Sequence, residues 1–198
     1  MGNIDRAEND WYMDQPEATE ALLRAEPFSG LSWDPACGAG TIPSTMRAFN
    51  LTCLGSDLVD RGYERASLRN FLGEREDGDE VANIVCNPPF SLARAFVDKA
   101  LLVATHKVAM LLPLTFLEGQ RKAYWLPTTP LARVHIFTWR ISMPPGELLL
   151  AGKVKPEGGK KCFAWFVWEH GHVGPWSGRL LIKTNAKAAS GSDKGRAA

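Results

Sequence analysis

The run Val108-Ala109-Met110-Leu111-Leu112 contains no polar residue, and it limits the folds open to this chain more than any other segment. A strand without polar alternation is normally covered on both faces, as in parallel sheets whose strands are connected by helices. Just before it, apolar residues between positions 92 and 104 recur at helical spacing. A helix that leads into a doubly covered strand predicts a parallel α/β sheet.

The same alternation of strand and helix continues along the chain. Strands are expected at residues 31–34, 51–55 and 81–86, and helices at 17–25, 41–49 and 58–72. Further strands are expected at 134–137, 162–168 and 179–183, with a mobile loop at 144–161. Trp165 and Trp168 are expected on one face, as packing residues. The pattern predicts a doubly wound sheet with its ligand crevice at the carboxyl ends of the strands.

The length of 198 residues fits one domain, expected over residues 1–183 and followed by a flexible basic tail at 184–198. The 45% hydrophobic and 23% charged content excludes a disordered chain. No window holds the roughly 20 apolar residues that a membrane span needs, and no signal peptide is recognisable, so we expect a cytoplasmic protein without membrane contact.

Cysteines and charge restrict the function further. The four cysteines are far apart, so neither a metal site nor a disulfide framework is expected. Residues 1–150 carry 14 Lys and Arg against 19 Asp and Glu, whereas residues 151–198 carry 9 against 3. The basic end could contact a polyanion or could serve only as a solvated tail.

The first candidate binding loop is Asp34-Pro35-Ala36-Cys37-Gly38-Ala39-Gly40, between a predicted strand and a predicted helix. Gly38 and Gly40 allow the backbone to approach a ligand, although a tight turn alone could also explain them. A dinucleotide fingerprint would have a third glycine where Pro43 stands, and the Gly-Lys-Ser/Thr of a P-loop is missing.

Asp57 follows the second predicted strand, about 20 residues beyond this loop, where an acid can accept hydrogen bonds from ribose hydroxyls. It could instead cap a helix that begins near Leu58. Because a cap does not explain the upstream glycines, we favour a nucleoside ligand.

The most specific motif is Asn87-Pro88-Pro89-Phe90, directly after the strand expected at 81–86. From residue frequencies, such a tetrapeptide should occur in a chain of this length on the order of once in a thousand sequences. A proline pair that only stiffens a loop is the alternative.

Together, these motifs resemble class I S-adenosylmethionine-dependent methyltransferases, in particular the amino-methyltransferases that include DNA adenine-N6 enzymes and phage-borne relatives. The resemblance extends from Tyr12 to Trp168, in an order similar to the gamma arrangement. It implies a Rossmann-like, mostly parallel sheet of seven strands, with the last strands antiparallel. It also implies an S-adenosylmethionine site formed by Tyr12, Asp34, Ala36, Cys37, Gly38, Gly40, Asp57, Leu58, Asn70 and Phe71.

The tetrapeptide suits methyl transfer to an amine, a reaction that depends chiefly on positioning. The Asn87 oxygen and the Pro88 carbonyl would hold the two amine hydrogens, Pro89 would keep the turn rigid, and Phe90 would stack on a planar acceptor. No basic side chain is required, since the proton leaves a nitrogen that is already cationic. Transfer to cytosine C5 is rejected because Cys86 ends an apolar strand, and a reactive role for Cys37 is disfavoured since no histidine is close in sequence.

The resemblance makes adenine N6 in nucleic acid, DNA first, the expected acceptor. A protein glutamine amide, guanine N2 in RNA, or a non-catalytic cofactor-binding module stay as alternatives. Asn70 stands where the family usually carries an acid that binds the cofactor's adenine, and Phe71 could flank that ring or belong to the core. Little of the chain is left for sequence recognition, so either specificity is low or a protein partner supplies it.

Overall fold

The computed structural model describes residues 10–73, 78, 80–156, 159 and 161–183. The tail predicted at 184–198 lies outside these residues. The elements, in chain order, are α1 (Pro16–Ala25), β1 (Ser32–Asp34), α2 (Thr41–Ala48), β2 (Cys53–Asp57), β3 (Ala66–Leu68), β4 (Val81–Cys86), α3 (Ala93–Val103), β5 (Ala104–Pro113), α4 (Gln120–Trp125), β6 (Leu131–Phe137), α5 (Gly146–Leu150), β7 (Phe163–Glu169) and β8 (Ser177–Leu181).

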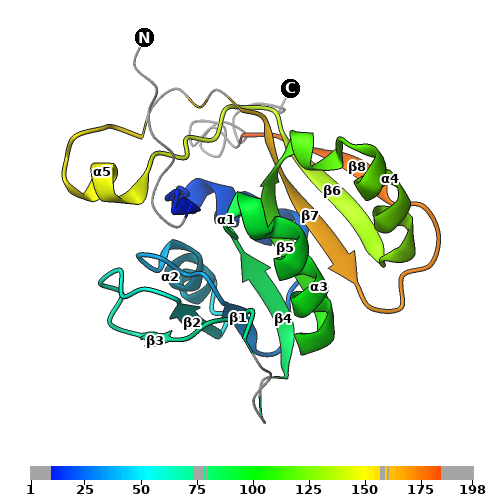
Figure 1. The fold of residues 1–198 in the computed structure, drawn as a ribbon, viewed down its shortest axis with the longest axis horizontal. Coiled ribbons are helices and arrows are strands. Elements are labelled where there is room, and N and C mark those ends of the chain that lie inside the picture. Colours follow the sequence, from blue (N-terminus) through cyan, green and yellow to red (C-terminus); the bar gives the residue numbers. More distant parts are fainter. Residues whose placement is uncertain (1–9, 74–77, 79, 157–158, 160, 184–198) are drawn as a thin grey trace, which may run out of the picture.

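All described strands belong to one sheet, in the order β3-β2-β1-β4-β5-β7-β6-β8 (Figure 1). The strands from β3 to β5 are parallel, β7 runs antiparallel between β5 and β6, and β8 is parallel to β6. The predicted mostly parallel sheet with antiparallel last strands is therefore confirmed. The sheet order reverses between β1 and β4, which brings the loops after Asp34 and after Cys86 to one crevice.

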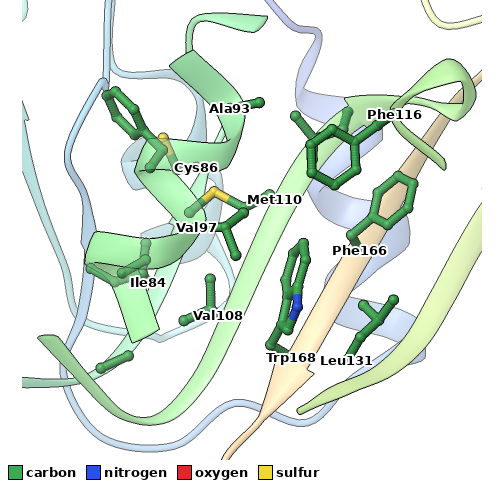
Figure 2. Close-up of a cluster of buried hydrophobic side chains, with 14 of the residues drawn as sticks. Ile84, Cys86, Ala93, Val97, Val108, Met110, Phe116, Leu131, Phe166 and Trp168 are labelled. Atoms are coloured by element: carbon green, nitrogen blue, oxygen red, sulfur yellow. The ribbon is translucent and has the colours of Figure 1, made fainter. Parts of the chain in front are cut away.

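Both faces of the sheet are covered, as the apolar run in β5 predicts. Val108, Met110 and Leu112 belong to the hydrophobic cluster beneath α3, shown in Figure 2. Ala109 and Leu111 point to the opposite face, in a second cluster with side chains from α1 and α2. No helix within the described residues combines the length and the apolar character needed to span a membrane.

The prediction of a helix at 58–72 is wrong. This stretch consists of turns and the short edge strand β3, so the sheet has eight strands rather than seven. The carboxylates of Asp57 and Asp60 accept hydrogen bonds from the backbone N–H groups of Val59 and Gly62. Such local bonds compete with a helix, and Gly62 adopts a left-handed φ of 82° that ends one.

Two smaller expectations also need correction. Residues 144–161, expected to be a loop, contain the helix α5, which Figure 1 shows far from the strands that it connects. Trp165 and Trp168 are both buried packing residues, but they lie in different core clusters. Their spacing of three residues places them on opposite faces of β7, because side chains in a strand alternate.

A buried ionic network fixes the end of α1 to the sheet. Glu26, the C-cap residue of α1, contacts Lys107 at 3.2 Å and His135 at 2.7 Å, and also pairs with Arg133. Burial alone would raise the pKa of Glu26, but hydrogen bonds from His135 and Arg133, together with the charges of Arg133 and Lys107, lower it to about 2. The network therefore fixes the C-terminal end of α1 to the strands β5 and β6.

Candidate active site at the ends of β1, β2 and β4

A cavity of about 420 Å³ lies at the carboxyl ends of β1, β2 and β4. Its volume is within the usual range for small-molecule sites, roughly 300–1,000 Å³. Four segments contribute its walls: residues 10–14, 35–39, 57–59 and 69–72, with Asn87 and Pro89 closing one side. Of the predicted site residues, Tyr12, Ala36, Cys37, Gly38, Asp57, Leu58, Asn70, Phe71, Asn87 and Pro89 line this cavity.

The glycine loop is shaped by Gly38 and Gly40, which have left-handed φ angles of 52° and 83°. The N–H of Gly38 donates to Asp57 Oδ2 at 2.8 Å, and the N–H of Cys37 donates to the carbonyl of Ser56 at 2.9 Å. A Cβ on Gly38 would lie 2.6 Å from Trp11 Nε1, so no larger residue fits there without a shift. The loop is thus held against the end of β2.

Asp57 does not cap a helix, because none follows it. Its carboxylate accepts hydrogen bonds from the Gly38 and Val59 N–H groups, at 2.8 and 3.1 Å. Each carboxylate oxygen has a second lone pair, so both can also accept a hydroxyl from the cavity. This geometry is compatible with the predicted ribose contact.

The wall beyond Asp57 contains three further predicted residues. Leu58 is exposed, and the side-chain oxygen of Asn70 accepts the Leu72 N–H at 3.1 Å. Phe71 is buried and meets Trp33 edge-on, with centroids 5.3 Å apart. Phe71 is therefore both a core residue and part of the cavity wall.

Asp34 lies behind the glycine loop rather than on the cavity surface. It is buried, and its Oδ1 accepts the N–H of Ala36 at 3.2 Å. Burial, and then the nearby carboxylate of Asp14, raise the pKa of Asp34 well above its ordinary value. Asp34 shapes the loop, and so does Gly40, which packs against Tyr63.

The tetrapeptide follows β4 directly. The Asn87 side-chain amide donates to the backbone carbonyl of Tyr12 at 2.9 Å. Its oxygen, Oδ1, is buried and has no hydrogen-bond partner among the described residues. Pro88 is buried, and the ring of Phe90 stacks on Tyr12 with centroids 5.8 Å apart and contacts Phe163 at 5.7 Å.

Residues 10–14, which we call the strap, cross the cavity beside the tetrapeptide. The strap pairs with residues far along the chain: Met13 N–H donates to the Pro144 carbonyl at 3.0 Å, and Gly146 N–H donates to the Trp11 carbonyl at 3.1 Å. The Arg61 guanidinium lies 4.2 Å from the centre of the Trp11 ring and pairs with Glu147 at 3.4 Å. The connection between β6 and β7 therefore holds the strap in place.

Sequence reasoning missed Asp14, the last strap residue. Its side chain lines the cavity, is 8% exposed, and has an oxygen, Oδ2, without a hydrogen-bond partner in the described part of the chain. Burial raises the pKa of Asp14 to about 6, although hydrogen bonds from its own backbone and from Asn87 lower it. A lone acid in sequence gives no sign of such burial.

No protein-family model matches the sequence, and no curated protein has a similar one. The fold, however, resembles solved structures. A protein assigned as a modification subunit of a type I restriction enzyme from Vibrio vulnificus YJ016 has a TM-score of 0.58 and 14% identity, over 93% of this chain and 49% of that one.

Two further structures are similar to the chain. A protein from Listeria monocytogenes assigned as a class I S-adenosylmethionine-dependent methyltransferase has a TM-score of 0.53 and 10% identity, over 82% of this chain and 61% of that one. A protein from Pyrococcus horikoshii assigned as an RNA methyltransferase has a TM-score of 0.51 and 12% identity, over 77% and 83%. The chain thus spans about half of the Vibrio subunit and about three fifths of the Listeria protein. It has the fold of class I S-adenosylmethionine-dependent methyltransferases.

Proposed function

We propose that the chain is an S-adenosylmethionine-dependent N-methyltransferase that acts on the exocyclic N6 amine of adenine in nucleic acid, DNA first. The observation that carries this proposal is the side chain of Asn87. Its buried Oδ1 has no partner among the described residues, and it lies on the same cavity as the glycine loop. Because an unpaired buried acceptor is costly, its presence indicates a ligand that donates a hydrogen bond.

The cavity also fits the proposed cofactor. Gly38 leaves room for the close approach of a ligand to the backbone, Asp57 would accept the ribose hydroxyls, and Phe71 would flank the adenine ring. The unpaired Asp14 oxygen gives the cavity an anionic wall, which suits a ligand that carries both an ammonium and a sulfonium group. When bound, S-adenosylmethionine supplies a methyl group on a positively charged sulfur, which leaves with the electron pair of the broken bond.

The protein's part in the reaction is to hold the acceptor amine. The Asn87 Oδ1 and the Pro88 carbonyl would accept its two hydrogens and favour a pyramidal nitrogen, whose lone pair then points at the methyl group. Phe90 would stack on the planar base and so fix its orientation. Such stacking accepts any base, because every base has an aromatic face. Alignment of this kind supplies most of the rate in an in-line displacement.

The structural relatives support a nucleic acid as the acceptor. They include proteins assigned as a type I restriction modification subunit and as an RNA methyltransferase. Because the first of these is assigned as a subunit, we propose that a protein partner supplies sequence recognition. An exposed or single-stranded base is the easier substrate, since flipping a base out of a duplex costs a few kcal/mol.

The test is transfer of a radiolabelled methyl group to DNA, RNA and protein pools offered in parallel. We expect label in adenine N6 of nucleic acid, and loss of that label in Asn87→Ala. Gln120→Ala, which removes an exposed amide on α4, is the matched control and should transfer normally. Label only in protein would contradict the acceptor, and full activity of Asn87→Ala would contradict the mechanism. Cofactor binding by calorimetry without transfer to any pool would indicate a binding module instead.

A further inference from the structure

The burial of Asp14 needs an explanation, because a carboxylate with an unpaired oxygen is costly in a cavity wall. Such a group is retained where it serves a site. Asp14 lies two residues after Tyr12, whose carbonyl holds the Asn87 amide, and it borders the same cavity as Asn87. Its position therefore connects it to the transfer site rather than to the core.

The orientation of the Asn87 side chain follows from its neighbours. A primary amide has two N–H donors and one oxygen acceptor. The nitrogen of Asn87 donates to the Tyr12 carbonyl at 2.9 Å and to the sulfur of Met143 at 3.9 Å. Both of these atoms only accept hydrogen bonds, so the nitrogen must face them, and the oxygen is the end left for a substrate. The amide also stabilises the charged carboxylate of Asp14, which lowers the pKa of that group.

We propose, on the basis of the function proposed above, that Asp14 is a positioning residue for methyl transfer. Its carboxylate fixes the side-chain amide of Asn87 so that the oxygen faces the acceptor amine, and its negative charge makes that oxygen a stronger hydrogen-bond acceptor. Hydrogen bonds in a chain polarise one another, and a charged partner strengthens the next bond in the series. The effect is largest when the amine nitrogen becomes cationic.

This role requires ionised Asp14, and its surroundings determine when that occurs. With its pKa raised to about 6 by burial, Asp14 is ionised above pH 6 and becomes protonated as the pH falls through that value. The other ionisable groups around it are Asp10 and Tyr12 on the strap, Asp34 with its partner Cys86, Cys37, Asp57, Arg61 and Arg69. Among these, Asp34 interacts with Asp14 directly, and its own pKa is also raised.

Activity variants provide the first test. Asp14→Asn keeps the shape but loses the charge, so we expect kcat at pH 8 to fall roughly 10- to 100-fold, with the KM for the acceptor within threefold. We expect kcat of the wild type to fall as the pH drops through about 6, and this fall should be absent in Asp14→Asn. Asp98→Asn, an exposed acid on α3, is the control and should keep both kcat and its pH profile.

An exchange of the two side chains separates positioning from mere structural support. Asn87→Asp places two carboxylates together and should abolish transfer, whereas the double variant Asp14→Asn/Asn87→Asp restores one amide beside one carboxylate. We expect the double variant to recover at least tenfold over Asn87→Asp. An unchanged kcat and pH profile in Asp14→Asn, or no recovery in the double variant, overturns the proposal.

A readout that needs no activity distinguishes this proposal from the proposed function. In cofactor-free protein with ¹³C-labelled aspartate carboxyl groups, the Asp14 signal should titrate near pH 6, and its midpoint should rise in Asn87→Ala, because the amide that stabilises the charge is gone. A shifted midpoint without methyl transfer would support the pairing and contradict the function. Transfer by the wild type with an unshifted midpoint would contradict the pairing alone.

Discussion

The indole ring of Trp11 lies directly against Gly146, so that a Cβ on this glycine would come within 2.5 Å of the ring. The same indole borders Gly38 of the glycine loop, 2.6 Å from the position of its Cβ. Trp11 thus joins the proposed cofactor loop to the connection between β6 and β7. This contact allows the strap to be tested without any change to a proposed catalytic group.

Gly146→Ala should displace Trp11 and weaken binding of S-adenosylmethionine. Overpacking of this kind typically costs about 1–3 kcal/mol, which corresponds to roughly 5- to 150-fold in the dissociation constant. Titration calorimetry measures the dissociation constant of S-adenosylmethionine in the variant and in the wild type. Gly178→Ala is the control, because its nearest neighbour outside the adjacent residues lies 3.8 Å from the added Cβ. Equal affinities in both variants would show that the strap does not support the site.

Asp14→Asn should make the cofactor-free protein more stable at pH 8. The pKa of Asp14 is raised from 3.8 to about 6, so the folded state disfavours the ionised form, and this penalty is absent below pH 3.8 and grows as the pH rises through 6. A neutral amide removes a penalty on the order of 2–3 kcal/mol. Urea unfolding at pH 8 and at pH 4 measures the difference, which should nearly vanish at pH 4. Destabilisation at pH 8 would contradict the raised pKa.

Glu26→Gln should destabilise the protein at neutral pH. The pKa of Glu26 is lowered from 4.5 to about 2, so its ionised form contributes stability that is fully present above pH 4.5 and is lost as the pH falls through 2. Removing the anion leaves the buried Lys107 with only one carboxylate contact, the longer one to Glu169 at 3.7 Å, at a cost of about 3 kcal/mol. Thermal unfolding at pH 7 and pH 3 should show a smaller difference at pH 3. Glu20→Gln, which loses only an exposed pair with Arg24, should change stability by less than about 1 kcal/mol.

Phe90→Ala should raise the KM for a nucleic-acid acceptor more than it weakens cofactor binding, because Phe90 does not line the cavity and contacts its wall through Tyr12. Stacking of a base on an aromatic ring contributes roughly 1–3 kcal/mol, so kcat/KM should fall about 5- to 150-fold. Phe90→Tyr keeps the ring and should retain most activity. If both variants transferred methyl groups as well as the wild type, the acceptor would not stack on this residue.

The sequence predicts the fold where local patterns are decisive. The apolar run in β5 requires cover on both faces, and the order of strands and helices then brings the loops after β1 and β4 together, so Asp57, Gly38 and Asn87 could be placed at one crevice. The stretch 58–72 misleads because its apolar residues imitate helical spacing, whereas Gly62 and two aspartate turns prevent a helix.

Contacts between distant segments have no local signature. Trp11 packs on Gly146. The residues next to either of them in the sequence do not indicate this contact. The burial of Asp14 depends on the same contacts, because the strap is held over the cavity by residues 144–146. The residues of the glycine loop and tetrapeptide were therefore predictable, and the resemblance also gave Tyr12, but the contacts that hold the strap and bury Asp14 were not.

The strap is tied to the rest of the protein at both ends. Asp14 lies two residues before Pro16, the first residue of α1, and α1 is secured by the bond from Trp165 Nε1 to the Ala18 carbonyl at 2.8 Å as well as by Glu26 at its far end. At the other end, the carboxylate of Asp10 accepts a hydrogen bond from the N–H of Ser91 at 2.9 Å, directly after the tetrapeptide. The strap and the tetrapeptide are therefore joined at Asn87 and at Ser91, so that a displacement of one also displaces the other.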